Sequence, residues 1–179
     1  RALAIYISLT SLQYLLLRVA GLNKSDSLIT SLSNISTAGL VNLNNGNIVT
    51  YGLAIKIIIT TFAFLSSLNF SILLLVSMRK FKDVSKGPEL KFHSGRIIGT
   101  TIVIMGILFM TYNKSFSSLK EFGNVLMQVI SYFTTAGYEI SDTHHWPPAA
   151  YAVILIQMFI GACAISSGGG IKAEIGRAH

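Results

Sequence analysis

Apolar segments long enough to cross a bilayer constrain this chain more than any other feature. Residues 2–22 form one such run, residues 48–78 a second, and residues 97–112 and 149–165 two more. About 20 helical residues match a hydrocarbon core of ~30 Å. The composition, 51% hydrophobic and 12% charged, argues against an ordinary soluble domain, in which roughly a quarter of residues are charged. The sequence therefore predicts an all-α integral membrane protein with four spans.

A basic stretch separates the second span from the third. Six of the fourteen Lys and Arg residues lie between Arg79 and Arg96. Excess Lys and Arg in a short loop mark its cytoplasmic side, whereas a nucleic-acid-binding protein needs a soluble basic face. We expect a cytoplasmic loop over residues 81–96, a membrane surface as the partner, and no nucleic acid.

Two shorter segments lie between the spans. Residues 27–35 and residues 119–133 are too short or too polar to cross a bilayer alone. Non-helical backbone next to such segments is tolerated at membrane depth only inside protein or along a water-filled cavity. We therefore expect two re-entrant helices.

Flanking residues predict where some of these helices begin. Ser25 or Asp26 can cap the first re-entrant helix through its free amides. Pro147 or Pro148 can begin the last span, because proline at the first helical position costs no hydrogen bond. Trp146 beside them is typical of the aromatic belt at the membrane interface.

The chain repeats itself at an offset of 98 residues. This offset brings Thr37-Ala38-Gly39 onto Thr135-Ala136-Gly137, in phase with the apolar topology. It also pairs Leu28 with Leu126, Ile29 with Met127, and Ser33 with Ser131. We interpret residues 1–80 and 97–173 as parallel membrane-pore-membrane repeats, a symmetry that a central pore requires.

Each re-entrant helix is followed by small residues that suit an ion-binding backbone. Backbone carbonyls can replace the hydration shell of a cation, and glycine permits the unusual backbone angles that this needs. The expected ligand is therefore a cation, and no organic cofactor is expected. The alternative is a plain interhelical turn, because Ala-Gly is a common helix stop. The predicted filter residues are Ser36, Thr37, Ala38 and Gly39 in the first repeat, and Thr134, Thr135, Ala136 and Gly137 in the second.

These segments together resemble the Trk/Ktr/HKT superfamily of potassium transporters, and most of all the membrane subunit of bacterial Trk systems. The resemblance is carried by Phe133–Tyr138, Trp146-Pro147 and Phe159–Lys172, with support from Ser33–Gly39 and the Asn69 region. It implies four repeats around one pore, of which this chain is similar to the second and third. It also implies K⁺ uptake across the bacterial inner membrane, with K⁺ as the only metal. The partners that it implies are membrane lipid, a second copy in a homodimer and a cytosolic nucleotide-binding regulatory subunit.

Two other functions stay open. A Na⁺-permeable or Na⁺-coupled member of the same superfamily is one, and a non-conducting structural or regulatory membrane subunit is the other. An enzyme is not expected, because no nucleophile–base pair or metal cluster lies within a span.

A glycine-rich run interrupts the last span. The resemblance implies that it is an intramembrane gate loop beneath the filter, although the family has glycines where Ala162 and Ile165 stand. Packing of glycines between helices is the alternative, and the spacing of a phosphate-binding loop is missing. The predicted gate residues are Gly161, Ala162, Cys163, Ala164, Ile165, Ser166, Ser167, Gly168, Gly169 and Gly170.

Two polar residues lie near the predicted pore. Asn69, deep in the second span, serves either as an interhelical hydrogen-bonding group or as an ion contact. Lys172 either acts on ions near the gate or anchors the helix at the interface. Residues 174–179 can be encoded by the start of a common sequencing adapter, so we expect them to be a non-native tail.

The loop after the second filter carries charged and imidazole side chains. Glu139 and Asp142 can raise the local cation concentration, or they are ordinary loop polarity. His144 and His145 with Asp142 are more typical of a solvated loop than of a metal site, because adjacent residues seldom converge on one ion.

Overall fold

The structure is a computed structural model that describes residues 2–38, 48–68, 88–112 and 119–160. These segments form six helices and no strand, which confirms the predicted all-α class. The helices are α1 (Ala2–Val19), α2 (Lys24–Ser36), α3 (Leu53–Ser67), α6 (Pro88–Tyr112), α7 (Leu119–Phe133) and α8 (Pro148–Ile160).

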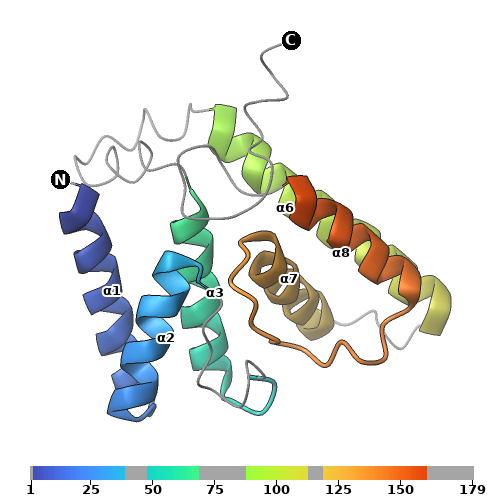
Figure 1. Ribbon diagram of the computed structural model, residues 1–179. Helices are drawn as coiled ribbons and strands as arrows, with labels where there is room; N and C mark the ends of the chain where they lie inside the picture. The colour runs from blue at the N-terminus through green and yellow to red at the C-terminus, as the bar shows by residue number, and fades with distance from the viewer. Residues whose placement is uncertain (1, 39–47, 69–87, 113–118, 161–179) are drawn as a thin grey trace.

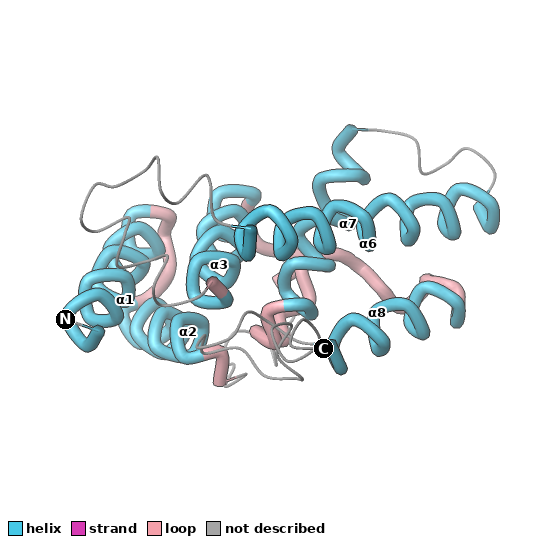
Figure 2. Tube along the Cα trace, turned by 90° about the horizontal axis from the view of Figure 1, so that it is seen from above, coloured by secondary structure: helices cyan, strands magenta, loops and turns pink. Residues whose placement is uncertain are grey.

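The helices pack as two groups of three (Figure 1). Helices α1, α2 and α3 contact one another, as do α6, α7 and α8, and α3 contacts α7 between the groups. In Figure 1, α1 and α6 begin toward the upper side, and α3 and α8 end toward the same side. Helix α2 lies between α1 and α3 in the chain, and α7 lies between α6 and α8. Figure 2 shows the two groups side by side from above. The two groups therefore have the same order and the same direction.

The first core includes residues from both groups. Leu17 lies in the last turn of α1 and Leu22 comes just after the helix. Ile55, Ile59 and Ala63 lie on α3. The remaining members come from loops, and three of them follow α7: Ile48, Ala136, Tyr138 and Ile140. In α2, the buried side-chain amide of Asn34 donates to the carbonyl oxygen of Ile59 (2.9 Å). The loop after α7 thus completes the core of the first group.

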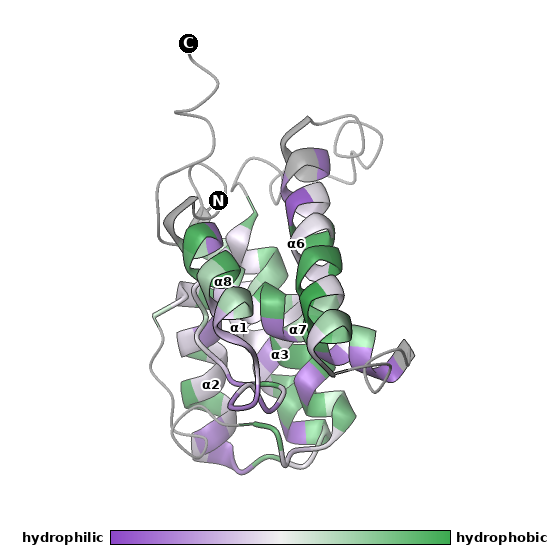
Figure 3. Cartoon of the chain, turned by 90° about the vertical axis from the view of Figure 1, so that its right-hand side faces the viewer, coloured by the Kyte–Doolittle hydropathy of each residue, from purple (hydrophilic) through white to green (hydrophobic). Residues whose placement is uncertain are grey.

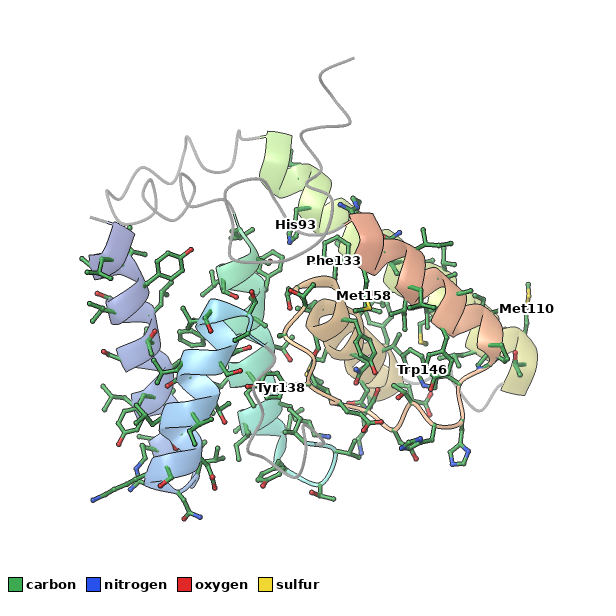
Figure 4. The ribbon with its side chains drawn as sticks, viewed as in Figure 1. His93, Met110, Phe133, Tyr138, Trp146 and Met158 are labelled. Carbon is green, nitrogen blue, oxygen red and sulfur yellow. The ribbon has the colours of Figure 1, made fainter. Side chains whose placement is uncertain are left out.

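The second core corrects the prediction for Trp146. Its side chain is only 6% exposed and packs with α6, α7 and α8, as Figure 4 shows. The other members are Ile97, Ile104, Leu108, Val125, Val129, Phe133, Ala150 and Ile154. Tertiary packing places the indole inside the group, so Trp146 does not face the membrane interface.

Helix boundaries agree with the sequence in some places and differ in others. Helix α7 covers the predicted residues, and α8 begins at Pro148. Helix α6 begins at Pro88, so residues 88–96 are helical and the predicted loop to Arg96 is wrong there. Pro88 is a favourable first helical residue, and no glycine or proline lies between it and Gly95.

The start of α2 also differs from the prediction. The capping position is Asn23, which makes no side-chain cap hydrogen bond. Its carbonyl oxygen accepts hydrogen bonds from the amide and the hydroxyl of Ser27 (2.9 and 2.8 Å). Ser25 and Asp26 lie inside the helix, so neither is its cap.

Helix α6 is long and apolar enough to cross a membrane. The qualifying segment is His93–Thr111, and α1, α3 and α8 contribute shorter apolar segments within the described residues. Apolar side chains of α6 point outward, among them Ile98, Ile102, Val103, Phe109 and Met110. Figure 3 shows the middle of α6 as a mostly hydrophobic rod with a polar beginning. This exposed apolar surface is suited to lipid or to further protein.

Candidate ion-binding loops

Helix α2 ends in a turn that reverses the backbone. The amide of Thr37 donates to the carbonyl oxygen of Asn34 (3.2 Å), and that of Ala38 donates to Ser33 (3.0 Å). Thr37 itself has left-handed angles, φ 49° and ψ 35°. These two bonds with one left-handed residue form a Schellman motif.

Helix α7 ends in the same way. The amide of Thr135 donates to Tyr132 (3.1 Å), that of Ala136 donates to Ser131 (3.0 Å), and Thr135 has φ 59°. Every donor and acceptor lies 98 residues after its counterpart in α2. The sequence offset therefore describes two equivalent backbone turns.

Threonine is an unusual residue for this position. A β-branched side chain at positive φ is a strained exception, and such strain concentrates at functional sites. The end of α1 has the same hydrogen-bond pattern, with Gly21 at φ 99° in the left-handed position. The left-handed position is thus occupied by glycine at the end of α1, and by threonine in both candidate loops.

Gly137 has a separate role from ending the helix. It lies two residues beyond the left-handed Thr135 and has φ 74°. A Cβ atom placed on it would meet nothing within 4 Å, so the requirement for glycine is a requirement of the backbone angle. The plain-turn interpretation uses glycine as the helix stop, and here that position is taken by Thr135.

The carbonyl groups of this loop differ in their partners. Gly137 is exposed, and no described residue donates a hydrogen bond to the carbonyl oxygens of Ala136 or Gly137. The next carbonyl, that of Tyr138, accepts from Ser131 Oγ (2.7 Å) and from Gln128 Nε2 (3.2 Å). Within the described part of the chain, the carbonyl oxygens of Ala136 and Gly137 therefore accept no hydrogen bond, whereas the one immediately after them accepts two.

The other predicted filter residues have mixed environments. Thr134 is buried, and its hydroxyl donates to the carbonyl oxygen of Ser131 (3.2 Å). Ser36 and Ala38 are exposed, and the Ser36 hydroxyl donates back to Leu32 (2.7 Å). The oxygen-bearing side chains thus bond to helix carbonyls, which is compatible with a site that uses backbone oxygens.

Tyr138 joins the second loop to the first group of helices. Its ring is fully buried in the first core, and its hydroxyl donates to the carbonyl oxygen of Thr30 in α2 (3.5 Å). The next residue, Glu139, accepts a hydrogen bond from the amide of Ile48 (2.8 Å). Figure 4 shows Tyr138 lying between α3 and the second group. These contacts join the second candidate loop to the first group of helices.

A buried polar cluster behind Phe133 is absent from the sequence-based predictions. His93 Nε2 lies 3.0 Å from Ser67 Oγ, and its ring meets the edge of the Phe133 ring at 5.0 Å. The guanidinium of Arg96 lies over the Phe133 ring, 4.5 Å from its centroid. It also donates a hydrogen bond to Gln157 Oε1 (3.1 Å). One helix, α6, thus contacts α3, α7 and α8 through two residues.

The loop after Glu139 exposes its imidazoles. His144 is paired with Glu139 and His145 with Asp142, each at 3.8 Å, and both imidazoles are largely exposed. Among the residues that the structure describes, no three potential metal ligands converge.

Several predicted site residues lie outside the described residues. They are Gly39 of the first loop, Asn69, Lys172, and the gate residues from Gly161 to Gly170.

Comparison with known proteins gives consistent relatives. The chain is 31% identical over 170 residues to the Trk system potassium uptake protein TrkH of Escherichia coli (strain K12), and 28% identical over 170 residues to TrkH of Halomonas elongata. It is 26% identical over 158 residues to TrkG of E. coli (strain K12). The TrkH alignments cover 94% of this chain and 35% of each relative, so the chain spans about a third of their length.

A solved structure matches as well. The crystal structure of the potassium transporter TrkH from Vibrio parahaemolyticus aligns with a TM-score of 0.82 and 26% identity. The match covers 96% of this chain and 37% of the transporter. No protein-family model matches the chain.

Proposed function

We infer that this chain, a homologue of the Trk potassium uptake proteins along 94% of its length, forms part of a membrane pore for K⁺ uptake. Residues 36–39 and 134–137 each supply a quarter of a carbonyl-lined filter. The glycine-rich residues 161–170 serve as the gate below it, and Asn69 and Lys172 line the path. K⁺ is the permeant ion.

The duplicated turn is the observation that carries this proposal. Two helices end with the same hydrogen bonds and the same strained threonine, 98 residues apart. In the second loop the carbonyl oxygens of Ala136 and Gly137, to which no described residue donates a hydrogen bond, follow at once. A partly dehydrated cation needs such oxygens on several sides, and repeated loops around an axis supply them.

The proposed setting is the bacterial cytoplasmic membrane. Helix α6 has the length and composition of a span, and outward-facing apolar residues accompany it on α1 and α8. The two helix groups run in the same direction, as parallel repeats about a membrane normal do. We assign residues 1–80 to one repeat, residues 97–173 to the next, and the basic stretch between them to the cytoplasm.

The packing of α2 and α7 supports additional repeats outside this chain. Met127 of α7 packs against the first core. Its counterpart in α2, Ile29, is 39% exposed, and the neighbouring Leu28 and Leu32 are exposed too. A ring of equivalent repeats would cover Ile29 with a helix equivalent to α3. The relatives are long enough to supply the further repeats.

A chimera tests the proposal. The matched 35% of E. coli TrkH would be replaced by residues 1–170, and K⁺ uptake measured in a strain that lacks its own uptake systems. We expect growth at low external K⁺ and saturable K⁺ influx. A chimera that is present in the membrane but carries no K⁺ would contradict the proposal. A much larger Na⁺ influx would instead favour the Na⁺-permeable alternative.

Partners follow from the same resemblance. We propose a homodimer, with a cytosolic nucleotide-binding subunit that regulates the gate. Crosslinking of the chimera in native membranes, with and without that subunit, tests both partners. A non-conducting membrane subunit remains the alternative function, and its filter loop would tolerate substitutions that a pore would not.

A further inference from the structure

Gln128 is a buried polar residue that lies outside the two candidate filter loops. It lies in α7, is 0% exposed, and stands one turn before Ser131 on the same face of the helix. A buried amide must satisfy both its donor and its acceptor atoms, or it destabilises the protein.

Gln128 satisfies them on the loop that follows the filter. Its Oε1 accepts hydrogen bonds from the amides of Ile140 (2.7 Å) and Ser141 (2.9 Å). Its Nε2 donates to the carbonyl oxygen of Tyr138 (3.2 Å). The two amide donors define which end of the side chain carries the oxygen, and the Tyr138 carbonyl defines which end carries the nitrogen.

Ser131 completes the arrangement. Its hydroxyl donates to the same Tyr138 carbonyl oxygen (2.7 Å), so that oxygen receives two hydrogen bonds from α7. The Tyr138 carbonyl is therefore directed toward the helix and is removed from the set that can face an ion. The backbone leaves α7 after Phe133, and hydrogen bonds connect it to the same helix again at residues 138, 140 and 141.

The first repeat is held in a different way. At the offset of 98 residues, Thr30 stands where Gln128 is, and Ser33 stands where Ser131 is. A threonine hydroxyl is too short to bridge two amides and a carbonyl at once. The carbonyl oxygen of Thr30 instead receives the hydroxyl of Tyr138 (3.5 Å). Among the described residues, a glutamine that bonds back to the loop is therefore found in the second candidate loop, and the equivalent position of the first carries a threonine.

We propose that Gln128 is a positioning residue for ion selectivity: it fastens the outer end of the 134–137 loop to α7 and ends the ion-facing carbonyls at Gly137. This inference rests on the proposed pore function and adds a specific residue to it. Loss of the anchor frees the Tyr138 carbonyl and lets the loop adjust to the smaller Na⁺.

The test uses the same TrkH chimera with three substitutions. Gln128→Met keeps the length of the side chain and removes all of its hydrogen bonds to residues 138–141, and Ser131→Ala removes one hydrogen bond to the Tyr138 carbonyl oxygen. Gln13→Met is the matched control, because Gln13 is equally buried but its side chain has no hydrogen-bond partner among the described residues. The readout is the ratio of K⁺ to Na⁺ influx, together with the amount of protein in the membrane.

We expect Gln128→Met to lower the influx ratio by about tenfold and Ser131→Ala by a smaller factor, since each lost hydrogen bond is worth up to a factor of about ten. Gln13→Met should keep the parental ratio. The double variant should fall short of the product of the single effects, because both residues act on one carbonyl oxygen. A parental ratio in Gln128→Met overturns the proposal, as does an equal fall in Gln13→Met.

A second measurement, thermal stability in K⁺, tests the inference even if a variant does not transport ions. K⁺ that binds the folded state raises the melting temperature, so purified protein is compared in KCl and in choline chloride. Gln128→Met should lose the K⁺-specific rise that Gln13→Met keeps, and an unchanged rise overturns the inference. A parent that shows neither transport nor K⁺ stabilisation contradicts the proposed pore, and this inference with it.

Discussion

Individual backbone angles separate the candidate loops from ordinary turns. Thr37 and Thr135 hold the left-handed position that Gly21 holds at the end of α1. Sequence reasoning singled out both tripeptides, and its alternative of a plain turn took Ala-Gly as the helix stop, because glycine is the usual left-handed residue. It also missed Gln128, whose partner amides lie 12 and 13 residues away and become neighbours only after the loop folds back.

Gly137→Ala should reduce selectivity without a steric clash. A Cβ would meet nothing within 4 Å, so the cost is that of a left-handed alanine, about 1–2 kcal/mol. Gly21→Ala is the control, since Gly21 also has positive φ and open surroundings. We expect similar losses of thermal stability in both variants, and a fall in the K⁺ to Na⁺ influx ratio in Gly137→Ala alone. An unchanged ratio in Gly137→Ala would contradict a filter role for Gly137.

Thr135→Gly should act in the opposite direction on stability. Relief of the strained threonine is worth about 1–3 kcal/mol, and the added freedom of glycine takes back about 0.5–1 kcal/mol. We expect a higher melting temperature together with weaker ion discrimination, because the loop is less constrained. Thr37→Gly should raise the melting temperature similarly. A lower melting temperature in both variants would show that the threonines are not strained.

At the scale of elements, apolar periodicity predicted where helices exist better than it predicted their edges. Helix α7 and the start of α8 at Pro148 follow from local signals. The first turns of α6 were assigned to a loop because they are basic, yet a basic segment can be helical when one face packs. Trp146 was placed at the interface by its sequence position, but its contacts with α6 and α8 decide its environment.

His93 connects three of these elements and should be sensitive to truncation. Its imidazole meets Ser67 of α3 and Phe133 at the end of α7. His93→Ala removes a hydrogen bond and leaves a cavity, so we expect a loss of about 2–5 kcal/mol in the free energy of unfolding. His144→Ala, which truncates an exposed imidazole, should cost little. Thermal denaturation of the purified chimera compares them, and equal melting temperatures would rule out this bracing role for His93.

At the scale of the whole molecule, the offset repeat predicted two equivalent groups of helices, and the structure has two groups in the same order. Sequence reasoning could not place one group against the other. That placement depends on the bond from Tyr138 to Thr30, which joins residues 108 positions apart, and on the bond between Ile48 and Glu139, about 90 positions apart. Pairwise contacts at such separations leave no periodic pattern in a single sequence.

The exposed face of α2 gives a test at this scale. If a further repeat covers Ile29, then Ile29→Trp should overfill the contact and prevent K⁺ uptake in the chimera. Met110→Trp is the control, because Met110 of α6 is 86% exposed and a tryptophan there can extend into lipid. Uptake and membrane content are measured for both. Equal, normal uptake would mean that the α2 face is not a contact between repeats.

The burial of Tyr138 in the first core also has a consequence for biosynthesis. A ribosome adds about 5–20 residues per second, so roughly 5–20 s separate the appearance of Ile48 from that of Tyr138. During this interval the first core lacks the Tyr138 ring that belongs to it in the folded chain. The first group of helices can therefore reach its final packing only after residues 136–140 have been synthesised, so the two helix groups complete their packing together.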